Sequence, residues 1–88
     1  MIGHTLPITL KLTGKNGLDP HVSAELAMTA AKFHSHITIA AHHQGVDAKS
    51  VAQVMGLGAE HNDLVELHAE GEQAQQAVNA LIAVIQKR

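Results

Sequence analysis

The fold of this chain is decided at Asn16-Gly17-Leu18-Asp19-Pro20-His21-Val22, where an alternating apolar pattern stops and a helical pattern begins. Gly17 can supply the positive φ that a sharp exit from a strand often needs. Asp19 is a favoured N-cap residue, and Pro20 suits the first helical position. The free amides and the dipole of such a helix start suit a carboxylate or a phosphoryl group. The stretch therefore predicts a helix start at Asp19, which either only caps the helix or also belongs to an anion site.

The spacing of apolar residues predicts four strands and three helices. Alternation indicates strands over 5–13, 36–42 and 64–69 and a very short strand around Val46. Helical spacing indicates helices over 20–33, 49–57 and 72–86. Pro7 lacks an amide hydrogen, so the first strand should be partly unpaired or at an edge. The order βαββαβα predicts an α+β fold, a two-layer sandwich with three helices on one face of a four-stranded antiparallel sheet.

Composition limits the classes of function. A chain of 88 residues predicts one domain, residues 1–88. A single aromatic residue, Phe33, and a formal net charge of −2 argue against nucleic-acid binding. The absence of cysteine excludes disulfides and thiolate metal sites, and no apolar run is long enough to span a membrane. We therefore expect a cytoplasmic protein that has neither nucleic acid nor membrane as a partner.

Four short motifs make the chain similar to the histidine-containing phosphocarrier (HPr) family of the bacterial phosphotransferase system. They are Asn16-Gly17-Leu18 before the first helix, Ala48-Lys49-Ser50 opening the second, Leu57-Gly58 closing it, and Ala69-Glu70-Gly71-Glu72 before the third. The resemblance covers essentially the whole chain. It implies an HPr-like open-faced sandwich and a role in phosphoenolpyruvate-dependent sugar phosphotransfer or an allied regulatory pathway. It also implies a carrier or regulatory protein rather than an enzyme, with no cofactor.

The phosphoacceptor site departs from the family pattern. After Gly-Leu the family has His, a variable residue, Arg and Pro, and this histidine accepts the phosphoryl group. Here those positions hold Asp19, Pro20, His21 and Val22. The resemblance thus places Asp19 at the phosphoacceptor position, with His21 as a competing acceptor and Pro20, His21 and Val22 as the anion-holding helix start. The arginine that would clamp a phosphoryl group is missing.

The resemblance assigns two further features to the second helix. Ser50 matches the family's regulatory phosphoserine, and some members that have lost the histidine act only as regulators through that serine. Val51, Ala52 and Met55 would form the apolar patch of the partner surface, with Met28, Ala31 and Gln53 at the surrounding positions. The implied partners are phosphotransferase-system or regulatory proteins and, if Ser50 is regulatory, a serine kinase.

Two alternatives stay open. The same helix-end surface could belong to a protein-binding module that is never phosphorylated. Histidine-based metal binding is the other, because the chain has eight histidines and neutral imidazole is a common metal ligand. His34 and His36 could share a strand face, with His42 near the other end, yet this spacing matches no closed site and no metal ligand is assigned. No Ser-His-Asp order, glycine-rich phosphate loop or carboxylate pair is visible, so no catalytic residue is assigned.

Overall fold

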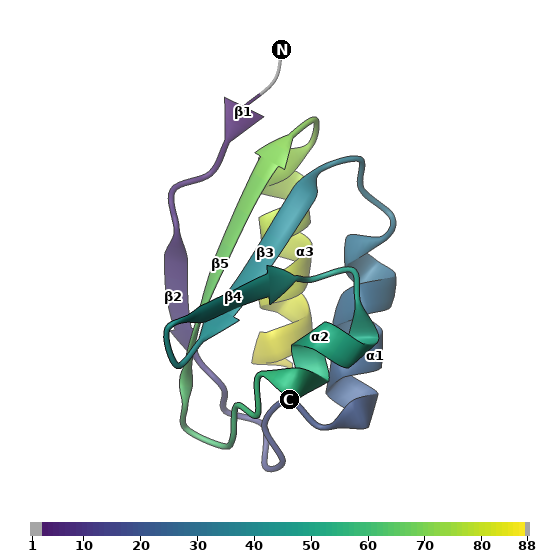
Figure 1. The fold of residues 1–88 in the computed structure, drawn as a ribbon. Helices are drawn as coiled ribbons and strands as arrows, with labels where there is room; N and C mark the ends of the chain where they lie inside the picture. Colours follow the sequence, from purple (N-terminus) through teal and green to yellow (C-terminus); the bar gives the residue numbers. More distant parts are fainter. Residues whose placement is uncertain (1–2, 88) are drawn as a thin grey trace.

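A computed structural model describes residues 3–87 of the chain as a sheet with three helices on one face (Figure 1). The elements in chain order are β1 (Gly3–His4), β2 (Ile8–Lys11), α1 (Pro20–Ala30), β3 (His36–Ala41), β4 (Gln44–Asp47), α2 (Val51–Gly56), β5 (Leu64–Gly71) and α3 (Ala74–Gln86). The predicted α+β two-layer sandwich is confirmed. Residues 1, 2 and 88, which the predicted domain includes, lie outside the described residues.

The sheet is organised around β5, the last strand of the chain. It pairs antiparallel with β3 on one side and with both β1 and β2 on the other, while β4 pairs with β3 at the opposite edge. In the described residues the sheet therefore has five strands where four were predicted. The difference arises because β1 (Gly3–His4) precedes the predicted strand over 5–13, of which Ile8–Lys11 forms β2.

The predicted strand over 5–13 forms only from Ile8 to Lys11, and Thr5, Leu6 and Pro7 connect β1 to it. Pro7 has no amide hydrogen to donate to the neighbouring strand. Thr5 bridges the gap, because its amide donates to the Ala69 carbonyl (N···O 2.8 Å) and its hydroxyl accepts the Ala69 amide (2.9 Å). Leu6 instead points into solvent, with 79% of its surface exposed. The partial pairing predicted around Pro7 is thus confirmed.

Each helix is shorter than its predicted range. The first ends at Ala30, because the amides of Lys32 and Phe33 donate hydrogen bonds to carbonyls three residues earlier instead of four. The second begins only after Ser50. The predicted start of the third helix at Glu72 is wrong, since Gln73 has a left-handed backbone with φ +62° and the helix begins after it. Within residues 3–87, no helix has the length and apolarity that crossing a membrane requires.

The core lies between the sheet and the helices. The alternation in β3 and β5 buries Ile37, Ile39 and Leu67, which pack in one cluster with Leu26 of α1 and Leu81 of α3. The side chains between them in sequence point to the other face of the sheet, which the helices leave open (Figure 1). The fold thus has a buried face, an open face, and one end where α1 begins.

Candidate functional site

The start of α1 is capped by the carboxylate of Asp19. Asp19 has an extended backbone, and its Oδ1 accepts the amide hydrogen of Val22 at 2.8 Å. The amide of Ser23 donates to the Asp19 carbonyl at 2.9 Å, which makes the first helical hydrogen bond. Pro20 stands at the beginning of the helix, where a missing amide hydrogen costs nothing. The predicted cap at Asp19 is therefore confirmed.

The turn before this helix rests directly on another loop. Gly17 has φ +58°, and a Cβ atom added to it would lie 2.4 Å from the Ala59 carbonyl oxygen and 2.6 Å from the Glu60 Cα atom. The Leu18 amide donates to the same Ala59 carbonyl at 3.0 Å. Gly17 is therefore required for two reasons, its positive φ and the close approach of backbone to backbone.

Asp63 stabilises the loop of Ala59 and Glu60 against which this turn packs. Its Oδ2 accepts the Glu60 amide hydrogen at 2.8 Å and lies 3.0 Å from His42 Nε2 in the turn between β3 and β4. The Glu60 amide is the main reason why the pKa of the Asp63 carboxyl lies below its usual value; loss of hydration opposes the shift, and His42 adds to it. This carboxylate thus stabilises the fold at neutral pH, and the contribution is lost as the pH falls through the lowered pKa.

Asp19 and His21 line a shallow pocket at this end of the molecule. The pocket has a volume of about 170 Å³ and is lined by Gly14, Lys15, Asn16, Gly17, Asp19, His21 and Val22. Lys15 was not singled out in the sequence, although a basic residue beside Asn16-Gly17 was a visible signal. It is the one Lys or Arg among the lining residues. His21 is exposed and also lines a hollow of about 420 Å³ along α1, together with Met28.

The predicted anion-holding residues offer few free donors. Pro20 has no amide hydrogen, and that of Val22 is already donated to Asp19. Among these three residues only His21 keeps an amide without a described partner. An incoming anion would therefore have to displace the Asp19 carboxylate from the helix start, or bind there next to this negative charge.

Ser50 caps α2 instead of lying in its first turn. Its Oγ accepts the Gln53 amide hydrogen at 3.2 Å, and the side chain is half-buried. The predicted patch on this helix is exposed: Val51, Ala52 and Met55 all face solvent. Met28 on the neighbouring α1 is 69% exposed. These are the apolar side chains that a partner could cover at this side of the molecule.

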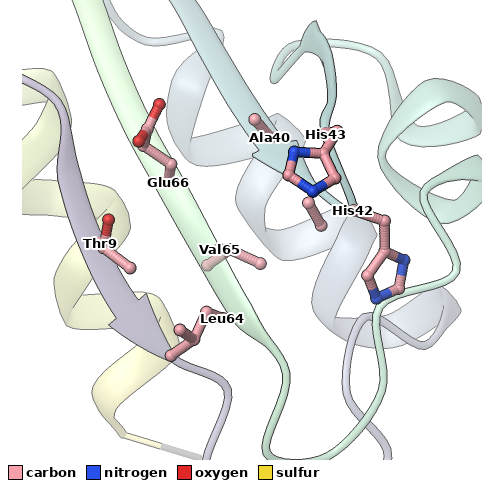
Figure 2. A pocket seen from close by; sticks show the side chains of 8 residues that line it. Thr9, Ala40, His42, His43, Leu64, Val65 and Glu66 are labelled. Atoms are coloured by element: carbon pink, nitrogen blue, oxygen red, sulfur yellow. The ribbon is translucent and has the colours of Figure 1, made fainter.

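A further pocket, of about 240 Å³, lies beside the turn between β3 and β4 (Figure 2). Thr9 comes from β2, Leu64, Val65 and Glu66 from β5, and His42 and His43 from the turn. None of the lining residues is Lys or Arg, and Glu66 brings a negative charge. This pocket therefore does not suit a phosphoryl group.

The histidines considered for metal binding are not brought together. His34 precedes β3 and so does not share a strand face with His36, and His42 is engaged with Asp63. In the part of the chain that the structure describes, no group of three or more His, Asp or Glu side chains stands ready to hold a metal ion. The expected common face for His34 and His36 is thus wrong, because the strand begins at His36.

Comparison with known proteins decides the family. A family model described as "PTS HPr component phosphorylation site" matches residues 7–87. The chain belongs to the HPr family. The phosphocarrier protein HPr of Xylella fastidiosa strain Temecula1 is 33% identical over 88 residues, covering 100% of this chain and 94% of that protein. The crystal structure of HPr-C-His from Thermoanaerobacter tengcongensis has a TM-score of 0.88 at 33% identity, covering 93% of this chain and 92% of that chain.

A second solved structure with this fold is Crh, the catabolite repression HPr of Bacillus subtilis. Its solution structure has a TM-score of 0.70 at 28% identity and covers 94% of this chain and 99% of that chain. HPr proteins are phosphocarriers that work with other proteins of the phosphotransferase system. The prediction of a carrier-type protein rather than an enzyme is confirmed by this membership, as is the HPr-like fold.

We expect Gly17→Ala to lower the free energy of unfolding by more than about 1 kcal/mol, because Ala there is strained in φ and overlaps backbone atoms. Gly56→Ala is the matched control, since Gly56 lies in α2 with open space around its Cα and an added methyl there favours the helix by up to about 1 kcal/mol. Urea unfolding of both variants measures the difference. Equal losses would show that the contact with Ala59 and Glu60 does not hold the turn.

We expect Asp19→Ala to cost roughly 0.5–2 kcal/mol of stability, since it removes the cap of α1 and a favourable charge at the helix start. Asp19→Asn should cost less, because its side-chain carbonyl still accepts the Val22 amide. Unfolding midpoints of the three proteins give the comparison. Identical midpoints would mean that the carboxylate contributes nothing to the helix.

Proposed function

We propose that this HPr-family protein acts in phosphoenolpyruvate-dependent phosphotransfer or an allied regulatory pathway as a docking protein whose phosphoacceptor site is altered. The observation that carries the proposal is the hydrogen bond between Asp19 Oδ1 and the Val22 amide. At the position of the family's phosphoacceptor, the side chain occupies the helix start itself. Asp19 is then mainly a cap, and His21 is the competing acceptor. A cytoplasmic location belongs to the proposal.

Three features of the helix start disfavour phosphoryl transfer. The carboxylate of Asp19 repels an anionic donor, and its Oδ1 is engaged with the Val22 amide. His21 stands where the family has arginine, and imidazole lacks the bidentate fork of a guanidinium. Lys15 is the cation beside the pocket, but an ammonium acts as a point charge rather than as a planar clamp. Uptake at this end should therefore be slow.

The surface that a partner would cover is nevertheless present. Val51 and Met55 on α2 and Met28 on α1 are large apolar side chains with 37%, 40% and 69% of their surface exposed. Burial of such side chains is a main source of free energy in protein association. The structural similarity to Crh, the catabolite repression HPr of Bacillus subtilis, supports including a regulatory pathway in the proposal.

Phosphoryl uptake is tested by intact mass after incubation with phosphoenolpyruvate and the first enzyme of the phosphotransferase system. We expect the wild-type protein to gain little or no phosphoryl group, and any that it gains to be released by hydroxylamine, as from an acyl phosphate on Asp19. The double variant Asp19→His with His21→Arg should form phosphohistidine on the existing fold. His21→Arg alone is the matched control, because it restores the clamp without the acceptor.

Two outcomes would contradict the proposal. Rapid phosphorylation of the wild type that His21→Gln abolishes would make His21 a working acceptor. Failure of the folded double variant to accept phosphate would mean that the partner surface has been lost as well. The protein-binding module without any phosphoryl chemistry would then be the better description.

Regulation at Ser50 by a serine kinase is the second part of the proposal. We expect Ser50→Asp to leave the fold intact, because Asp can also accept the Gln53 amide, and to change partner affinity through a charge beside Val51. Ser50→Asn is the matched control, since it keeps the cap without the charge. Circular dichroism and a binding assay with a phosphotransferase-system partner measure the two effects. Unfolding of the Asp variant, or equal affinities of both variants, would refute regulation by charge.

A further inference from the structure

Three adjacent strands place two histidines on either side of a glutamate. In the sheet register, Glu70 of β5 lies directly opposite His4 of β1 and also directly opposite His36 of β3. Residues that face each other across antiparallel strands point to the same side of the sheet. The three side chains therefore form one row across the sheet, although they are far apart in the sequence.

This row lies on the open face of the sheet. The neighbours of these residues, Ile37 and Ala69, are buried under the helices, so alternation directs His36 and Glu70 away from the core. His68 is two residues before Glu70 on the same strand and so shares this face. The ring centroids of His68 and His4 are 6.5 Å apart. The open face thus gathers three imidazoles and one carboxylate.

The donor atoms of this group are not committed to other interactions. Among the described residues, none of the four side chains has a hydrogen bond or an ion pair, and His4, His36 and Glu70 are exposed. Their side chains do not converge on one point as they stand. The exposed rings of His4 and His36 can change rotamer in picoseconds to nanoseconds, and no hydrogen bond or ion pair holds them apart.

The strand spacing allows the four side chains to meet. Neighbouring strands are about 4.8 Å apart, so the backbones that carry His4 and His36 are separated by about 9.6 Å. A metal above Glu70 would lie midway, with imidazoles reaching inward from both sides to bonds of about 2.0–2.1 Å. His68 is a diagonal neighbour of both histidines, at a backbone distance of about 7–8 Å. No strand has to move.

We propose that His4, His36, His68 and Glu70 bind one divalent transition-metal cation of the zinc type on the open face of the sheet. Imidazole nitrogens with one carboxylate suit zinc, nickel or copper, and not calcium or magnesium, which prefer oxygen ligands. The group lies at the end of the sheet opposite to the start of α1 (Figure 1). The site is therefore independent of the phosphoacceptor position.

Isothermal titration calorimetry with zinc chloride, on protein freed of metal with a chelator, tests the proposal. We expect saturable binding of one equivalent, weakened as the pH falls from about 7.5 to about 5.5 because protonated imidazole cannot bind a metal. His4→Gln, His36→Gln and His68→Gln should each lower the affinity at least about tenfold, the loss seen even when only a supporting group is removed. His43→Asn is the control, since His43 is an exposed histidine in the turn after β3 and Asn tolerates its positive φ.

Nuclear magnetic resonance of the imidazole groups gives a second measurement. Zinc should shift the ring signals of His4, His36 and His68 and leave those of His43 and His61 unchanged, without a change of oligomeric state in sedimentation. Absence of saturable binding would overturn the proposal. So would equal losses in the control variant, or binding that requires two protein chains per metal, because the donors would then lie elsewhere.

Discussion

The close approach of Gly17 to the backbone of Ala59 and Glu60 is the constraint on which the end of the molecule at the start of α1 depends. Because of this approach, the turn before α1 packs against the loop that leads into β5. The Leu18 amide holds the two together by donating a hydrogen bond to the Ala59 carbonyl. The loop is in turn held by Asp63, which joins it to the turn after β3 through His42. Strand, loop and helix start are thus one connected unit, and the position of Asp19 follows from it.

This unit explains how the start of α1 is held without a bound ligand. A histidine at the start of α1 would leave the positive helix end free for a phosphoryl group. Asp19 instead caps this helix end, because its side-chain oxygen accepts the Val22 amide hydrogen. The helix start is therefore satisfied without any ligand.

The sequence contained most of the fold because short-range rules decide it. The cap at Asp19, the alternation of Ile37 and Ile39, and the helical spacing in α3 each appear in the residues themselves. The failures concern long-range geometry. The extra strand β1 and the unpaired start of the predicted strand depend on the hydrogen bonds between Thr5 and Ala69, and the late start of α3 depends on the left-handed backbone of Gln73.

The same limit applies to the sites. The sequence placed Asp19 and His21 together because they are two residues apart, but its common strand face for His34 and His36 was wrong. His4, His36 and His68 lie on three different strands, and only the register of β5 brings them onto one face.

The register of β5 also governs how the chain folds. β5 pairs with β1, β2 and β3, so the chain must bring Leu64–Gly71 back to partners as distant as Gly3. Contacts of such separation close large loops and slow folding, whereas the hairpin of β3 and β4 can form locally. Both α1 and α2 are synthesised before β5, and the sheet is complete only when this strand enters its centre.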